Sequence, residues 1–311
     1  SLPFGTLALT GSNVAVTENA AMDLGASTIG GTANFNSTSN VITDSGTLAI
    51  TGATTINAGT ADITLDQAAS TFGALALTGA NVAVTENAAT DLAASTVSGT
   101  LGITSTGAVT DSGTLAITGA TTISASGQDI TLNEAASTFG TLALTGANVA
   151  VTENAATDLG ASTVSGTFGI TSGGAITDSG TQTITGAATF TNTAGTNDAI
   201  TLDDVSNDFS GTVTFSTDSG SAVTIVDTTA LDLLALSAAS LSVTAGGAVT
   251  DSGTLAVSGA TTISASGQDI TLDEAASTFG TLALTGANVA VTENAATDLG
   301  ASTVGGTLGI T

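Results

Sequence analysis

The chain lacks several residue types on which protein chemistry depends. It contains no Lys, Arg, His, Cys, Trp or Tyr, and only one Pro and one Met among 311 residues. Without His and Cys, the usual zinc sites and the Ser-His-Asp and Cys-His nucleophile systems cannot form. Without Lys and Arg, no group can neutralise phosphate, which excludes nucleic acid as a partner. We therefore expect a protein that is not an enzyme, with no cofactor and no catalytic, cofactor-binding or metal-binding residue.

The chain does contain enough apolar surface for a core. Its 26 Asp and Glu residues give a formal net charge of −26, but 41% of its residues are hydrophobic and the mean hydropathy is +0.45. Disorder requires low hydrophobicity together with high net charge, so we expect a folded chain. No apolar run reaches the roughly 18 residues of a membrane helix, and we expect no membrane insertion.

One sequence unit recurs along the chain. The isoleucine of its Ile-Thr-Leu phrase falls at Ile63, Ile130, Ile200 and Ile270. These spacings of 67, 70 and 70 predict one continuous domain over 1–311, made of about four and a half repeats. The predicted repeats are 1–62 (partial), 63–129, 130–199, 200–269 and 270–311 (partial). Extra residues fall in the polar stretches 191–199 and 216–222, which we expect to project from one face.

Each unit is a series of apolar-x-apolar triplets separated by turn residues. Leu142 with Leu144, and Val149 with Val151, are two such triplets, which we expect to point inward. The predicted fold is an all-β, right-handed parallel β-helix (β-solenoid) with three sides, about three short strands and roughly 22 residues per coil, about 14 coils and no helix. The alternative is an array of β-sandwiches, one per unit.

Three phrases carry a family resemblance: ITLDDVSNDFSGTVTF from Ile200, LSVTAGGAVTDSG from Leu241, and GANVAVTENA, which recurs. They resemble the repeats of filamentous-haemagglutinin-like giant bacterial adhesins and related β-strand-repeat exoproteins, over the whole chain. The resemblance implies a right-handed β-helix shaft that is secreted or displayed on the bacterial cell surface. It implies a structural, non-enzymatic role in an extracellular fibre or biofilm.

The partners expected of such a shaft are further coils or copies of itself, end to end. Other cells, surfaces or glycans would be bound through parts outside this chain. An alternative function is a self-assembling extracellular filament whose subunits stack end to end, because the sequence shows no motif that caps the open strand edges of a β-helix. A further alternative is a carbohydrate-binding or carbohydrate-cleaving β-helix.

Two acidic positions recur with the unit and are candidates for calcium binding, because carboxylates suit a hard cation. The Val-Thr-Glu-Asn phrase contributes Glu18, Glu86, Glu153 and Glu293. The Thr-Asp-Ser-Gly phrase contributes Asp44, Asp111, Asp178 and Asp251. The competing interpretation is a solvated turn acid that hydrogen-bonds the nearby backbone, and we favour it because equivalent acids lie one whole unit apart, too far to share an ion.

Three further features of the sequence could indicate a function, and each also has an ordinary structural interpretation. Adjacent carboxylates that could serve a glycoside hydrolase follow the Ile-Thr-Leu phrase at Asp203–Asp204, Asp273–Glu274 and, with one acid, Asn133–Glu134. Outward threonines such as Thr141 and Thr145 suggest ice binding as a possible activity. That activity needs a threonine in every coil, and we expect these threonines to recur only once per unit. The divergent stretch 198–245, with Phe209, Phe215 and the run LDLLAL, is interpreted as a variant coil with the same core.

Overall fold

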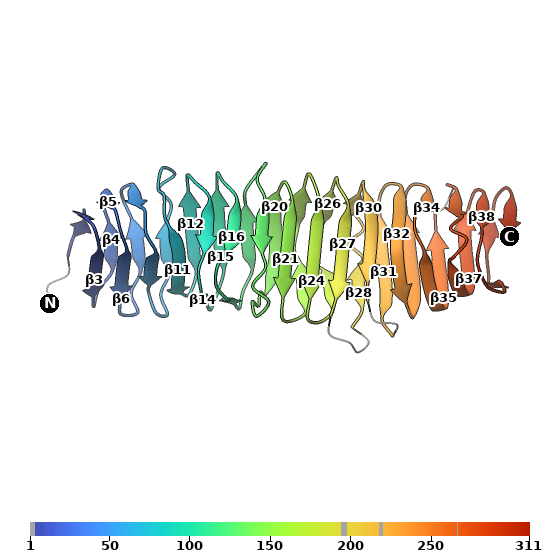
Figure 1. The fold of residues 1–311 in the computed structure, drawn as a ribbon, viewed down its shortest axis with the longest axis horizontal. Helices are drawn as coiled ribbons and strands as arrows, with labels where there is room; N and C mark the ends of the chain where they lie inside the picture. The colour runs from blue at the N-terminus through green and yellow to red at the C-terminus, as the bar shows by residue number, and fades with distance from the viewer. Residues whose placement is uncertain (1–3, 194–197, 218–219, 266) are drawn as a thin grey trace. The chain divides into compact units, whose positions relative to one another are not determined.

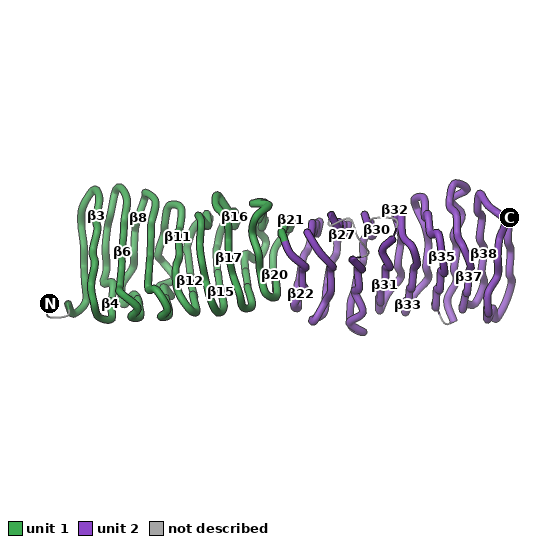
Figure 2. The backbone as a smooth tube through the Cα atoms, turned by 90° about the horizontal axis from the view of Figure 1, so that it is seen from below, with its two compact units in different colours: residues 1–154 green, residues 155–311 purple. Residues whose placement is uncertain are grey.

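The computed structural model describes residues 4–193, 198–217, 220–265 and 267–311. Within these ranges every regular element is a β-strand, and the predicted absence of helix is confirmed. The chain makes about 15 turns of a parallel β-solenoid, close to the 14 predicted, and the sandwich alternative is wrong. The turns divide between two compact units, Ser1–Asn154 and Ala155–Thr311 (Figure 2). No described segment is a helix long and apolar enough to span a membrane.

One turn of unit 1 illustrates the construction (Figure 1). The strand β12 (Val82–Glu86) forms one side, and the chain returns through two short strands, β13 (Thr90–Leu92) and β14 (Ser95–Val97). It then reaches β15 (Leu101–Ser105), which pairs in parallel with β12. We call a side made of one strand undivided and a side made of two short strands divided. Three strands per turn are therefore confirmed.

The two short strands share one side, so the predicted three-sided coil is wrong. The straight strand β11 (Ala74–Gly79) pairs with both of them, Leu75 opposite Leu92 of β13 and Thr78 opposite Thr96 of β14. The bend between the short strands is too shallow to create a third side. The turn is also shorter than predicted, because Val82 pairs with Leu101, 19 positions later.

The strands of unit 1 stack in two series, one for each side. The first side holds β1 (Thr6–Leu7) with β2 (Thr10–Gly11), β4 (Met22–Leu24) with β5 (Ser27–Ile29), β7 (Ile42–Asp44) with β8 (Leu48–Ile50), β10 (Ile63–Leu65), β12, β15, β18 (Thr121–Ser124) and β20 (Thr141–Gly146). The second side holds β3 (Val14–Glu18), β6 (Ala33–Ser37), β9 (Thr54–Asn57), β11, β13 with β14, β16 (Val109–Asp111) with β17 (Leu115–Ile117), β19 (Ile130–Leu132) and β21 (Val149–Glu153).

Unit 2 is built in the same way. Its first side holds β22 (Thr157–Leu159) with β23 (Ser162–Val164), β25 (Ile176–Asp178) with β26 (Gln182–Ile184), β28 (Ile200–Leu202) with β29 (Asp208–Phe209), β31 (Ala222–Asp227), β33 (Ser240–Ala245), the second half of β35 (Leu255–Ser264), β37 (Thr278–Gly286), and β39 (Asp298–Leu299) with β40 (Thr303–Val304). Its second side holds β24 (Phe168–Ser172), β27 (Ala188–Asn192), β30 (Thr212–Ser216), β32 (Leu231–Ala238), β34 (Val249–Asp251) with the first half of β35, β36 (Ile270–Leu272), β38 (Val289–Val291) and β41 (Leu308–Ile310).

The sequence repeat and the coil are out of step by half a turn. Starting at Val82 on the first side of unit 1, the register passes through Leu101 and Thr121 to Leu142, which is three turns. The chain then crosses to the second side, where Val149, the repeat equivalent of Val82, pairs with Ile130. One repeat therefore takes about three and a half turns, and equivalent residues of successive repeats lie on opposite sides. The predicted three whole coils per repeat is wrong.

Alternation of side chains along each strand produces the core. Leu142, Leu144, Val149 and Val151 are at most 3% exposed, as predicted. Their neighbours Ala143 and Ala150 point outward, which matches the period of two along a strand. Glycine is required at the bend of the divided side, where turns stack most closely. A Cβ at Gly113 would collide with the backbone of Ala94 in the turn before.

Candidate functional sites

The glutamate of the Val-Thr-Glu-Asn phrase ends an undivided strand and points inward at Glu18, Glu86 and Glu153, and lies just beyond the strand at Glu293. Glu86 is fully buried, and its Oε1 accepts a hydrogen bond of 2.7 Å from the backbone N–H of Phe72 in the preceding turn. Glu153 accepts the same bond from Phe139 at 2.7 Å. In the outermost copies Glu18 and Glu293 accept it from the backbone of Phe4 and Phe279. The four glutamates thus hold the backbone of one turn to the next.

No cation in the chain can offset the burial of these carboxylates. Burial raises the pKa of the Glu86 carboxyl, and hydrogen bonds from the Phe72 backbone and the Thr90 side chain reduce the shift. In the divergent copy a shorter acid, Asp227, accepts the equivalent bond from Phe209 at 3.3 Å. Burial likewise raises the pKa of Asp227, and the nearby charge of Asp208 adds to the shift.

The aspartate of the Thr-Asp-Ser-Gly phrase holds the loop that follows the Ile-Thr-Leu strand in the next turn. The carboxylate accepts a backbone N–H bond of 2.7–2.8 Å in every copy. The pairs are Asp44 with Asp66, Asp111 with Asn133, Asp178 with Asp203, and Asp251 with Asp273. Both recurrent acids are therefore backbone acceptors, as the turn-acid interpretation predicted. The expectation that they are solvated and bond their own turn is wrong, because Glu86 and Asp44 are buried and accept from the backbone of a neighbouring turn.

Three of these aspartates lie next to another acid. The pKa is raised for Asp44, Asp178 and Asp251, and burial is the largest cause in each. The charges of Asp66, Asp203 and Asp273 raise these pKa values further. Among the described residues no three acids are grouped as a metal ion would need, so the calcium hypothesis gains no support.

The adjacent carboxylates proposed for a glycoside hydrolase lie on this same loop. The Asp204 carboxylate accepts bonds from the backbone of Ser206 and the hydroxyl of Thr181. The backbone N–H groups of Asn133 and Glu134 donate to Asp111. These groups form a recurring loop anchor.

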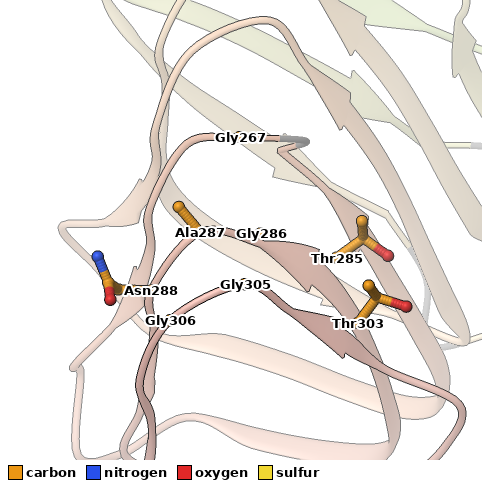
Figure 3. A pocket seen from close by; sticks show the side chains of 8 residues that line it. All are labelled: Gly267, Thr285, Gly286, Ala287, Asn288, Thr303, Gly305 and Gly306. Atoms are coloured by element: carbon orange, nitrogen blue, oxygen red, sulfur yellow. The ribbon is translucent and has the colours of Figure 1, made fainter.

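A recess of about 470 Å³ lies at a corner of unit 2 (Figure 3). Three successive turns line it through backbone and small side chains, and none of the candidate acids is among them. The lining residues are Gly267, Thr285, Gly286, Ala287, Asn288, Thr303, Gly305 and Gly306. Gly305 stands where the second repeat has Ser98, so part of the recess is the space of a missing side chain.

Asn288, in this recess, belongs to a hydrogen-bonded column that we did not predict. Its amide nitrogen donates 2.9 Å to Asp269 in the turn before, and its Oδ1 accepts from the backbone and hydroxyl of Thr307 in the turn after. Asp62, Asn81 and Thr100 form the same column in unit 1. The recurrent Gly-Ala-Asn phrase was the available signal, but partners 19 positions apart become visible only once the turn length is known.

The divergent stretch 198–245 has an ordinary core, as we interpreted it. Phe209 and Phe215 are buried, and their rings contact Phe190 with centroids 6.0 Å and 5.8 Å apart. The run LDLLAL lies in β32, where a register shift turns Leu234 outward to 40% exposure. Of the two predicted projections, residues 194–197 and 218–219 lie outside the described part of the chain.

Outward hydroxyl groups recur in consecutive turns, contrary to our expectation. Thr145 lies in register with Ser124, which follows Thr104 and Thr85 in the turns before. The column arises because the coil is shorter than the repeat, so different parts of one unit stack on each other. Thr141, in contrast, lies outside this column, because it is the first residue of β20 and the pairing with β18 begins only at Leu142.

Sequence comparison places the chain in one family. A family model described as "Repeats of unknown function (DUF5649)" matches residues 11–78, 79–145, 146–216 and 220–285. The chain therefore belongs to this repeat family. No curated protein and no solved structure matches it. The boundary between residues 78 and 79 falls at the last residue of β11, just before the chain crosses to β12 on the other side.

Proposed function

We propose that the chain is a structural, non-enzymatic shaft segment of an extracellular bacterial surface fibre or giant adhesin. The observation that supports this most strongly is the use of its acids. In the repeats the Thr-Asp-Ser-Gly aspartate and the Val-Thr-Glu-Asn glutamate, or Asp227 in its place, accept backbone hydrogen bonds between turns. A catalytic carboxylate is expected once per site, beside a cleft. Carboxylates that recur with the sequence repeat suit a protein whose task is to span distance.

The extracellular location rests on the resemblance to filamentous-haemagglutinin-like repeats and on composition. A surface with no basic residue and many hydroxyl groups stays hydrated and repels nucleic acid and anionic membranes. The test is immunogold labelling of cells that make the protein, with antibody raised against this chain. We expect label on surface fibres, and label confined to the cytoplasm would overturn the proposal. Sugar release from a panel of bacterial and plant polysaccharides would replace it with the carbohydrate-cleaving alternative.

End-to-end filament formation remains the second candidate. Leu299 and Leu308 are 43% and 47% exposed, whereas their repeat equivalents Leu92 and Leu101 are at most 1% exposed. A turn of another copy stacked on this one would cover both side chains, as a filament requires, whereas a covalent shaft needs no such contact between copies. Electron microscopy of the purified chain separates the two. Continuous fibres support stacking of copies, and separate particles at high concentration support a covalent shaft.

A further inference from the structure

Except for Asp232 in the single long strand β32, the outward positions of the undivided strands carry no charge. In unit 1 the outward residues of the undivided strands β12, β15, β18 and β20 are Ala83, Thr85, Gly102, Thr104, Thr122, Ser124, Thr141, Ala143 and Thr145. In unit 2 those of β31, β33, the second half of β35 and β37 are Ala222, Thr224, Val226, Ser240, Ser242, Thr244, Thr262, Ser264, Thr281, Ala283 and Thr285. The acids of these strands, such as Glu86 and Asp227, point inward.

The other sides of the same turns carry the acids, and these sides are divided except opposite β31, where β32 forms the whole side as one strand. Opposite β12, β15 and β18 they hold Asp91, Asp111 and Glu134. Opposite β31, β33 and the second half of β35 they hold Asp232, Asp251, Asp273 and Glu274. Each of these turns therefore has one uncharged side and one acidic side. Because the repeat takes about three and a half turns, the acids lie on the first side in some turns of a compact unit and on the second side in the others.

We propose that the uncharged sides are lateral contact surfaces for a second copy of this chain, lying parallel and in register. When the neighbour is related by a translation across the solenoid axis, the first side of each turn in one copy faces the second side of the same turn in the other copy. The acidic side of one turn then meets the uncharged side of the neighbouring turn, and acid never faces acid. A neighbour related by a two-fold axis along the same direction would bring acidic sides together, which like charge disfavours. Translation gives an open contact that can continue to further copies.

The available area agrees with this arrangement. One undivided strand of about five residues, at ~3.3 Å per residue and ~4.8 Å between turns, offers roughly 80 Å². A stable interface needs about 800 Å² from each partner, or about ten turns. The chain has about 15 turns. Because no Trp, Tyr or Arg can act as an anchor, contact along many turns must replace a few strong contacts. The proposal is independent of the extracellular role argued above.

The first test adds equal charge to the two kinds of side in the full chain. Thr104→Asp with Thr244→Asp places acids on uncharged sides, and Thr110→Asp with Thr250→Asp places them on divided sides. All four threonines are exposed strand residues. Association is measured by sedimentation and by the second virial coefficient from light scattering in about 0.1 M salt, where the Debye length is about 10 Å. We expect at least about tenfold weaker association for the first pair and less than about twofold change for the second.

The opposite substitution gives the opposite result. Thr104→Lys with Thr244→Lys should strengthen association, because each lysine meets the neighbour's acidic side. If Asp and Lys act alike, if both Asp pairs act alike, or if the parent chain shows no self-attraction at any salt concentration, the proposal is wrong.

The second test uses the absence of cysteine from the chain. Thr104 in β15 and Thr110 just beyond it in β16 occupy the two sides of one turn. A mixture of Thr104→Cys and Thr110→Cys chains should form heterodimeric disulfides under mild oxidation. Thr104→Cys alone should form few. Efficient homodimer formation by Thr104→Cys would show two-fold contact and overturn the parallel, in-register arrangement.

Discussion

Leu115 and Ser137 in unit 1 occupy the same repeat positions as Gln182 and Asn207 in unit 2. In unit 1 the buried hydroxyl of Ser137 accepts a 3.0 Å bond from the backbone N–H of Leu115. In unit 2 the Asn207 side chain accepts the corresponding bond from Gln182 at 2.7 Å. Both side chains of unit 2 are fully buried and polar, whereas unit 1 buries one apolar and one polar side chain. The backbone bond is kept although both residues have changed.

The polar version brings further hydrogen bonds and one unsatisfied atom. The Gln182 amide nitrogen donates to the carbonyls of Leu159, Gly160 and Gly180, and the Asn207 amide donates 2.6 Å to Asp178. The Gln182 Oε1 is buried without a hydrogen-bond partner. The comparison shows that this position requires an acceptor for the strand N–H in the turn before. It does not require a particular side chain, since any group that reaches the N–H serves.

The largest effect is expected where the core itself receives a charge. Leu144→Asp puts an unpaired carboxylate into a fully buried position of β20, and we expect a loss of about 3–5 kcal/mol in the free energy of unfolding. The neighbouring outward substitution Thr145→Asp should change it by less than about 0.5 kcal/mol. Urea unfolding followed by circular dichroism measures both, and similar losses would contradict the inward–outward alternation.

Removal of the acceptor tests the comparison directly in both units. Ser137→Ala leaves the N–H of Leu115 buried and unpaired, and Asn207→Ala does the same to Gln182. We expect each to cost about 1–3 kcal/mol. Asn207→Ala should be the more harmful, because Asp178 also loses a donor. Asn207→Ser restores the unit 1 residue, and it should recover part of the loss if the acceptor is the requirement.

Gln182→Leu should have a smaller effect of opposite sign. The substitution removes the unpaired Oε1 and adds apolar contact, and we expect a gain of about 1 kcal/mol in the free energy of unfolding. Two of the three carbonyls that Gln182 contacts keep other donors, Ser179 for Leu159 and Ser162 for Gly160. A clear destabilisation would show that the amide bonds outweigh the unpaired oxygen.

The smallest change per site is expected from pH. Burial raises the pKa of five carboxyls, those of Asp44, Glu86, Asp178, Asp227 and Asp251. Their stabilising contribution is complete below the ordinary values of 3.8 for Asp and 4.5 for Glu, and is lost as pH rises through the folded-state values. The free energy of unfolding should therefore fall as pH rises above these ordinary values.

Glu86→Gln provides the matched variant for the pH prediction. The glutamine can still accept the bond from Phe72, but it has no charge to bury. We expect a flatter pH profile and higher stability at neutral pH than in the parent chain. Asp62→Asn removes an exposed acid whose acceptor role asparagine preserves, and it serves as the control for the loss of one negative charge. An unchanged profile for Glu86→Gln would remove Glu86 as a source of the pH dependence.

Much of the local structure could be predicted from the sequence. The alternation at Leu142, Leu144, Val149 and Val151 predicted inward side chains, and all four are buried. That the recurrent acids accept backbone hydrogen bonds was also predictable, although several of them, such as Glu86, are buried and bond an adjacent turn and not the local backbone. Their partners were not, since Asp111 and Asn133 are 22 positions apart and meet only through the coil.

The sequence by itself determined that this protein is a repeat built from short parallel strands, because the period of two along each strand is a local property of the residues. Only the tertiary structure decided how the strands close into a turn. A repeat of 67 residues is compatible with three long coils or with three and a half short ones. The choice depends on whether two short strands lie straight enough to share one side. They do, as β11 spans both β13 and β14, so each repeat ends half a turn out of phase and presents its uncharged side in the opposite direction.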